Sequence, residues 1–177
     1  MKISNHLILI FITCFISING HSQNDNKKYW FQMDYAAEKI INDLDSLGID
    51  TILTAFYHLD NGIGSNATKI IFWKKNGETF VNAVRLKKID KFKVFGQSKL
   101  PSDSIFQFFF DNRLDTVTSN PKSELSISHN FGYSVDFKYG SSKYNLYLRN
   151  EKRSYDPTHL KSMWIEMIDR VGRKYYE

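Results

Sequence analysis

The segment Ala67–Lys87, with the sequence ATKIIFWKKNGETFVNAVRLK, decides the fold. Two runs rich in β-branched and aromatic residues flank the pair Asn76-Gly77. An Asn-Gly pair between such runs is the strongest short-range signal for a β-hairpin, because both residues accept the positive φ angles of a two-residue turn. The turn places Trp73 opposite Phe80, and both faces of the hairpin carry apolar side chains. The sequence therefore predicts a hairpin inside a sheet rather than at an open edge.

Alternating apolar and polar residues predict further strands on both sides of this hairpin. With the hairpin's own strands, the expected set is Thr51–Asp60, Ala67–Lys75, Glu78–Lys87, Lys91–Phe95, Tyr133–Tyr139 and Ser142–Leu148. The last two flank Gly140-Ser141 and form a second hairpin. Its register is well defined, because a shift by one residue would exchange its apolar and polar faces.

Helices are predicted at both ends and in the middle of the domain. Tyr29–Leu47 carries apolar residues at three- and four-residue steps and is followed by Gly48, a typical left-handed helix end. Asp156-Pro157 provides a cap and a first position for the last helix. A middle helix is expected over 101–110, although its phenylalanines also suit a strand.

The order of these elements predicts the α+β fold class. We expect an antiparallel sheet of about five to six strands, with N-terminal, middle and C-terminal helices packed mainly on one face. The three tryptophans, Trp30, Trp73 and Trp164, are expected in the core or at its edge, because they lie on apolar stripes or face Phe80. Tyr147 lies on the polar face of the second hairpin and is expected to be exposed.

The first residues have the composition of an export signal. Lys2 precedes an apolar run from Leu7 to Ile18, and the small residues Gly20 and Ser22 favour cleavage after Ser22. The run is shorter than the stretch of about 20 residues that spans a membrane. We therefore expect a secreted or periplasmic protein, with a retained N-terminal anchor as the alternative.

The predicted organisation is a signal peptide over 1–22, a polar leader over 23–28 and one α+β domain over 29–177. The content of 42% hydrophobic residues supports a folded chain. Cys14 is the single cysteine and lies inside the signal, so the cleaved chain would have no disulfide, no thiolate metal ligand and no cysteine nucleophile.

A glycine pattern after the first strand has the spacing of a dinucleotide-binding turn. Gly62, Gly64 and Ala67 match G-x-G-x-x-A. Such a turn binds a pyrophosphate at the N-terminus of a following helix. Here strand-forming residues follow Ala67, and Asn76-Gly77 ends that segment directly. The pattern therefore indicates a loop between two antiparallel strands, and we expect no nucleotide.

Histidines provide the weak candidates for catalysis or metal binding. His58 and Asp60 are two residues apart on one strand, so their side chains share a face and could form an acid/base pair. His129, in an expected turn, is the other candidate. No metal-binding spacing connects the histidines, so we expect no resident metal and no cofactor. A metal-assisted or acid/base hydrolase remains the alternative function.

A basic stretch is the main interaction signal. Its cations, set against Asp90 alone, are Arg85, Lys87, Lys88, Lys91, Lys93 and Lys99. The first five are the candidate anion-binding residues. Outside the cytoplasm, an acidic protein, an anionic lipid or an acidic polysaccharide is a more plausible partner than nucleic acid. The alternative is an edge strand whose lysines prevent aggregation.

These observations predict a small exported domain that binds a partner without catalysis. The partner would be an anionic envelope component or a protein. The two alternatives are the hydrolase built on His58 and Asp60 and a partner-neutralising protein of the immunity type.

Overall fold

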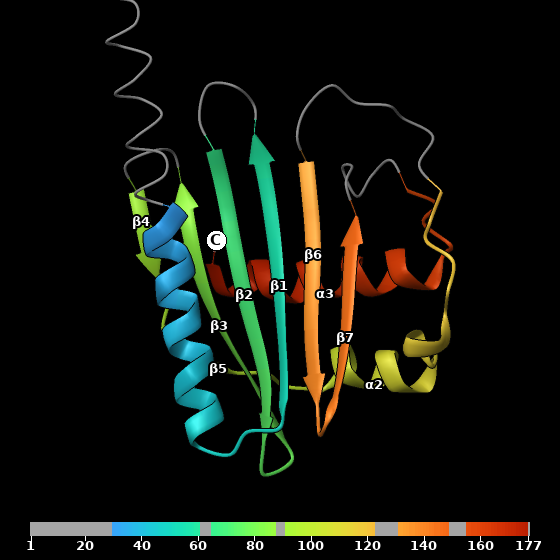
Figure 1. Cartoon of the computed structure of the whole chain (residues 1–177), viewed down its shortest axis with the longest axis horizontal. Helices are drawn as coiled ribbons and strands as arrows, with labels where there is room; N and C mark the ends of the chain where they lie inside the picture. The colour runs from blue at the N-terminus through green and yellow to red at the C-terminus, as the bar shows by residue number, and fades with distance from the viewer. Residues whose placement is uncertain (1–29, 61–64, 88–90, 123–130, 149–154, 177) are drawn as a thin grey trace, which may run out of the picture.

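The computed structural model describes residues 30–60, 65–87, 91–122, 131–148 and 155–176. This part of the chain contains one antiparallel sheet with helices on both of its faces (Figure 1). The strands are β1 (Thr51–Asp60), β2 (Ser65–Lys75), β3 (Glu78–Lys87), β4 (Lys91–Val94), β5 (Ser98–Lys99), β6 (Phe131–Tyr139) and β7 (Ser142–Leu148). Their order in the sheet is β4-β3-β2-β1-β6-β7, and the short β5 pairs with β3 beyond β4.

The hairpin of β2 and β3 forms as the sequence predicts. Asn76 and Gly77 have φ angles of 54° and 78°, the left-handed pair that a type I′ turn requires. Trp73 lies opposite Phe80, and their rings stack with centroids 5.7 Å apart. Because β1 pairs with one side of this hairpin and β4 and β5 with the other, the hairpin lies in the interior of the sheet.

The segments on either side of the glycine loop are two antiparallel strands. β1 and β2 pair from Ile52 opposite Trp73 to Asp60 opposite Ser65. This confirms the strand assignment after Ala67, whereas Gly62 and Gly64 themselves lie outside the described residues. A helix whose N-terminus could bind a pyrophosphate does not follow the loop, since the chain enters β2 there.

Three α-helices accompany the sheet in the described part of the chain. The N-terminal helix is described over 30–46 and ends at Gly48, whose φ is 72°. The N–H of Ile49 then donates to the carbonyl of Leu44, which closes the helix end as predicted. The others are α2 (Ser104–Asp111) and α3 (Leu160–Tyr176), and a 3-10 turn, η1 (Leu114–Thr116), follows α2.

The start of α3 differs from the prediction by three residues. Asp156 does not cap the helix itself, because its carboxylate accepts hydrogen bonds from the backbone N–H and the hydroxyl of Thr158, at 2.9 and 2.7 Å. These bonds form a tight turn ahead of the helix, and they lower the pKa of Asp156. The first helical residue is Leu160.

The α+β prediction is confirmed, and the structure adds the division of the core between two faces. α2 and α3 cover one face, with Trp164, Phe106 and Phe109 packed on Phe72 and Phe137 of the sheet. The N-terminal helix covers the opposite face and forms a smaller core (Figure 1). That core contains Met33, Ala37, Leu44, Ile49, Ile52, Ala67, Ile71, Trp73, Val84 and Leu86. Two of the three helices thus share a face.

The N-terminal helix leaves part of its face of the sheet uncovered. Its core contains residues of β1, β2 and β3, whereas Figure 1 shows β6 and β7 beside the helix rather than beneath it. Tyr147 of β7 is 63% exposed, as its position on the polar face predicts. No helix of the described residues is long and apolar enough to cross a membrane.

Candidate functional site

The sheet pairs the cations of the basic stretch with one another. β3 and β4 place Arg85 opposite Lys93 and Lys87 opposite Lys91. Residues directly opposite in an antiparallel pair lie on the same face, so the four positions share one face of the sheet edge. Lys88 lies outside the described residues. Like charges placed directly opposite destabilise a sheet, so this arrangement is not explained by the stability of the strand pair.

The end of α3 lies beside these cations. Ala83 belongs to the core under α2 and α3, and Arg85, two residues further along β3, points to the same face. Gly172 of α3 lies against Ile70, because a Cβ added to this glycine would be 2.4 Å from Ile70 Cδ1. Ile70 is paired with Ala83. The last turns of α3 therefore cross the sheet next to Arg85.

This crossing joins a second group of cations to the first. We define the basic surface by the strand residues Arg85 and Lys93 and the α3 residues Arg170, Arg173 and Lys174, whereas the side chains of Lys87 and Lys91 lie outside the described residues. Asp169 of α3 is buried and accepts a hydrogen bond from Arg173 Nε at 2.9 Å. Cations at a helix C-terminus are favourable, which explains how the fold tolerates this density of positive charge. No sequence pattern connects the α3 cations with β3, because β4, β5, α2, η1 and the β6–β7 hairpin separate them along the chain.

Two further observations concern the remaining lysines of the stretch. The Nζ of Lys93 lies 4.3 Å from the centroid of the Phe95 ring, in a cation–π contact. Lys99 forms an ion pair with Glu78 next to the hairpin turn, so it belongs to the opposite end of β3. The basic surface therefore includes Lys93 but not Lys99.

His58 lies in a different place, at the wall of a groove on the open half of the other face. Its ring meets that of Trp30 edge-on at 4.6 Å and is nearly parallel to that of Phe56 at 6.3 Å. The groove has a volume of about 420 Å³ and also contains Asp34 of the N-terminal helix and Asp136 of β6. The structure thus places His58 in one groove with two carboxylates that no sequence pattern connects with it.

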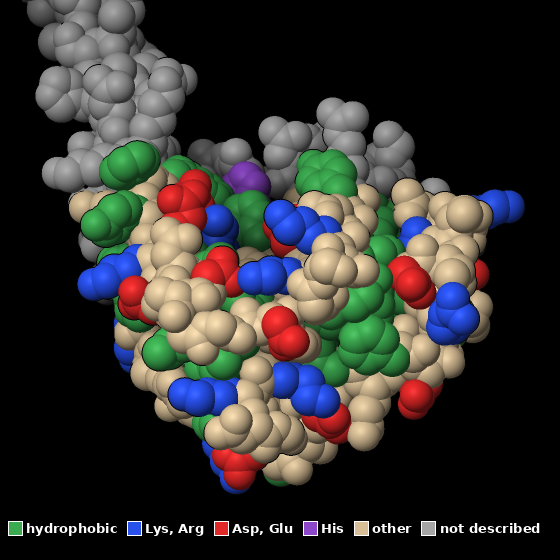
Figure 2. Space-filling model, turned by 60° about the horizontal axis from the view of Figure 1, so that its bottom comes forward, with side chains coloured by type: hydrophobic (Ala, Val, Ile, Leu, Met, Phe, Trp, Pro, Cys, Tyr) green, Lys and Arg blue, Asp and Glu red, His purple; other side chains and the backbone are tan. Residues whose placement is uncertain are grey.

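Both carboxylates in this groove already have partners. Asp34 forms an ion pair with Lys69 at 2.8 Å, and Asp136 accepts a hydrogen bond from Asn145 at 2.7 Å. On this side of the molecule basic and acidic side chains lie among one another rather than in blocks (Figure 2). The side chain of Asp60 and the whole of His129 lie outside the described residues. Among the residues that are described, no three potential metal ligands lie close enough to hold an ion.

A serine and a histidine also form a hydrogen bond ahead of α3, but the direction of this bond is the reverse of that in a catalytic pair. Ser119 Oγ lies 3.1 Å from His159 Nε2. The backbone N–H of Lys161 donates to His159 Nδ1 at 3.2 Å. Because Nδ1 accepts this bond, the neutral ring carries its proton on Nε2 and donates it to the serine. A general base must instead accept the serine proton, so this pair stabilises the turn rather than activating a nucleophile.

Lys161 is a buried cation in the first turn of α3, beside this serine–histidine pair, and it gives a stability prediction. It is 5% exposed, its Nζ donates to Asn120 Oδ1 at 2.9 Å, and burial lowers its pKa from the ordinary 10.5. The folded state therefore loses this proton at a lower pH than the unfolded state, and at neutral pH it bears the full cost of the buried charge. We expect Lys161→Met to raise the free energy of unfolding at pH 7.

The pH dependence separates this effect from simple packing. The advantage of Lys161→Met over the wild type should shrink as the pH rises through the window between the lowered pKa and 10.5, where the unfolded chain still holds the proton. Urea unfolding at pH 7 and near pH 10.5 measures it, with the exposed Lys143→Met as the control. An advantage that is the same at both pH values would contradict the electrostatic explanation.

Comparisons of the chain with known protein families and with curated proteins find no match. The fold and surfaces define the class: an α+β protein with an antiparallel sheet, a basic surface at one sheet edge and a polar groove on the opposite face.

Proposed function

We propose that this chain is an exported, non-catalytic binding domain whose basic surface takes an anionic partner. The observation that carries the proposal is the pairing of Arg85 with Lys93 and of Lys87 with Lys91 beside the cationic end of α3. A surface of one charge sign raises the local concentration of oppositely charged partners and speeds their association. The proposed export, by cleavage after Ser22, would make the partner an anionic component of the cell envelope or of the extracellular space.

A charge-reversal variant tests the proposal. Lys93→Glu with Lys174→Glu changes two exposed members of the basic surface, one from β4 and one from α3. Each basic residue near an anionic membrane contributes about 1 kcal/mol of binding. We therefore expect the double variant to bind vesicles containing phosphatidylglycerol at least about thirtyfold more weakly than the wild type. Co-sedimentation with the vesicles measures the binding.

The matched control changes the same number of charges elsewhere. Lys122→Glu with Lys143→Glu alters two exposed lysines outside the basic surface, so the net charge of the two double variants is identical. Binding of the wild type should also fall steeply between low and high salt, because exposed charges are screened. An equal loss in both double variants, or binding that ignores salt, would show that the basic surface is not the contact.

The same variants identify the class of partner. Wild-type binding to a sulfated polysaccharide, but not to the vesicles, would assign the surface to an acidic glycan. Co-purification of one acidic protein from the native host, lost in Lys93→Glu with Lys174→Glu, would favour the partner-neutralising alternative. Either result replaces the lipid as the partner.

The acid/base hydrolase is the second candidate, and the groove around His58 is what favours it. His58, Asp34 and Asp136 line one cavity, as a hydrolytic site would require. Its carboxylates are held by Lys69 and Asn145, which makes binding the better supported function. Hydrolysis of chromogenic esters, phosphoesters or glycosides by the wild type, abolished in His58→Gln, would establish catalysis; its absence from the wild type would remove this candidate.

A further inference from the structure

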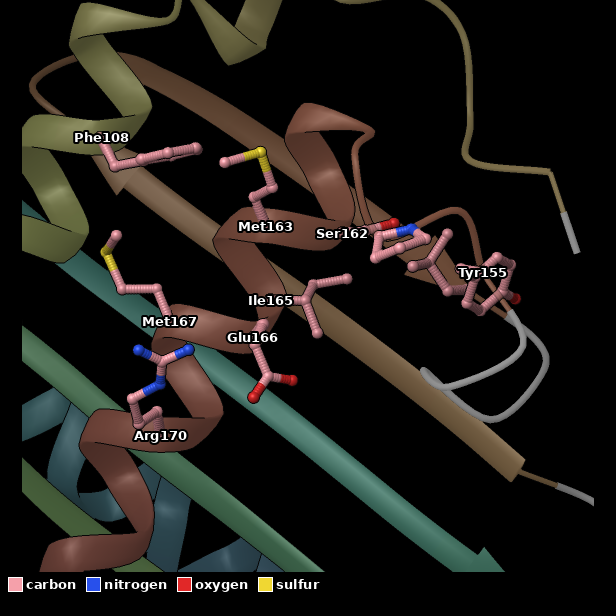
Figure 3. A pocket seen from close by; sticks show the side chains of 10 residues that line it. Phe108, Tyr155, Ser162, Met163, Ile165, Glu166, Met167 and Arg170 are labelled. Carbon is pink, nitrogen blue, oxygen red and sulfur yellow. The ribbon is translucent and has the colours of Figure 1, made fainter.

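A pocket of about 480 Å³ lies along α3 (Figure 3). Most of its lining is apolar, and its residues come from α2, α3, the end of β7 and the segment before α3. They are Phe108, Leu148, Tyr155, Pro157, Ser162, Met163, Ile165, Glu166, Met167 and Arg170. The volume is within the range of small-molecule sites, about 300–1,000 Å³.

The apolar part of the pocket has flexible walls. Figure 3 shows the side chain of Phe108 from α2 pointing toward those of Met163 and Met167 from α3. Met163 is 43% exposed, which is high for a large apolar side chain next to the core. Methionine is unbranched and adapts to irregular shapes, so these walls suit a flexible chain better than a rigid ring system.

Charge appears at one end of this apolar lining. Met163, Met167, Arg170 and Lys174 follow one another at steps of four, three and four residues, so they form a single stripe of α3. The stripe is apolar over its first two members and cationic over its last two. From Met163 to Arg170 it extends about 10 Å along the helix axis, the length of a medium acyl chain. Arg170 and Lys174 are also members of the basic surface.

We propose that this pocket holds the acyl chain of an anionic amphiphile, with its head group at Arg170. The inference deepens the proposed function and rests on it, because the basic surface would take the charged end. An apolar chain between Phe108, Met163 and Met167 adds the burial that surface cations cannot supply. The chain comes from a free fatty acid or from a membrane lipid, and the test distinguishes these sources.

Glu166 distinguishes the proposed site from a nonspecific apolar patch, because its charge predicts in which direction each charge variant changes the affinity for an anionic ligand. It lines the pocket four residues before Arg170 and therefore opposes an anionic head group. We expect Glu166→Gln to strengthen the binding of decanoate and Arg170→Gln to weaken it, each severalfold. Neither change should alter the binding of decanol, which has the same chain and a neutral head group.

The experiment is calorimetric titration of the full chain with decanoate and with decanol, without vesicles. Met163→Glu places a carboxylate in the apolar wall at an exposed position, and we expect it to weaken decanoate binding at least tenfold. Phe110→Glu is the matched control, because Phe110 is an exposed apolar residue of α2 outside the pocket lining. Lengthening the ligand by two methylenes should tighten wild-type binding by about tenfold.

The outcomes separate this inference from the proposed function. No decanoate binding, or equal losses in Met163→Glu and Phe110→Glu, would overturn the pocket even if Lys93→Glu with Lys174→Glu still abolished vesicle binding. Decanoate binding that depends on Met163 and Arg170 supports the pocket even if vesicles are not bound. If the wild type binds decanoate but not vesicles, the ligand is a free fatty acid. If the wild type binds both and Met163→Glu also binds vesicles more weakly, the pocket holds the chain of a membrane lipid.

Discussion

Trp164→Ala is expected to destabilise the protein by about 3–5 kcal/mol, the range for truncating a large buried aromatic side chain. Trp164 is 0% exposed, and its ring contacts those of Phe109 and Tyr144, with centroids 5.1 and 5.9 Å away. Its Nε1–H also donates to the carbonyl of Ile105 at 2.9 Å, which attaches α3 to the first turn of α2. Alanine removes the packing and leaves that carbonyl without its indole donor. The midpoint of thermal unfolding should fall by on the order of 10 °C.

Two control variants show how much of the stability lost in Trp164→Ala comes from packing and from the buried position of the ring. Trp164→Phe keeps an aromatic ring in the core but has no donor for Ile105, so it should cost clearly less than alanine. Phe110→Ala removes an aromatic ring from α2 that is 45% exposed and should change the free energy of unfolding by far less than Trp164→Ala. Urea unfolding of the three variants gives the comparison. Equal effects for Trp164→Ala and Phe110→Ala would contradict the placement of α3 on the sheet.

The parts of the fold that depend on neighbouring residues could be predicted from the sequence. Asn76-Gly77 determines the turn type, and the turn determines that Trp73 faces Phe80. Local patterns also predict correctly that Gly48 ends a helix and that Tyr147 lies on an exposed face. In each case the physical cause acts within a few residues, so the sequence pattern contains it.

The parts that depend on packing between distant segments could not be predicted. Nothing in the stripe of the N-terminal helix indicates that it covers the face opposite to α2 and α3, because both faces of β2 and β3 are apolar. The meeting of Arg85 with the end of α3 depends on how Gly172 settles against Ile70. Sequence reasoning therefore identified one half of the basic surface and missed the other.

The same limit applies to the groove and the pocket. His58 was selected with Asp60, its neighbour on β1, whereas the carboxylates that share its groove come from the N-terminal helix and β6. Met163 and Met167 have the spacing of a core stripe, and Met163 in fact lines an outer pocket with Phe108. A periodic pattern shows which residues share a face but not what covers that face.

Met33→Ala is expected to cost about 2–5 kcal/mol, because it empties the centre of the smaller core. Met33 is 0% exposed and packs with Ala37 of its own helix and with residues of β1, β2 and β3. This core is the main attachment of the N-terminal helix, because the described ion pairs that join this helix to the sheet, Asp34–Lys69 and Asp45–Lys138, remain partly open to solvent, which weakens them. Hydrogen exchange should therefore quicken over 30–46 more than over α3.

Met163→Ala is the matched control, since it removes the same side chain from an exposed position of α3. Its cost should stay within about 1 kcal/mol. The sheet separates the two cores, so loss of Met33 should loosen the N-terminal helix and the wall of the His58 groove without changing decanoate binding along α3. If Met33→Ala weakened decanoate binding as much as Met163→Glu does, the two faces would be coupled through the sheet, and the pocket could not be treated as a site of α2 and α3 alone.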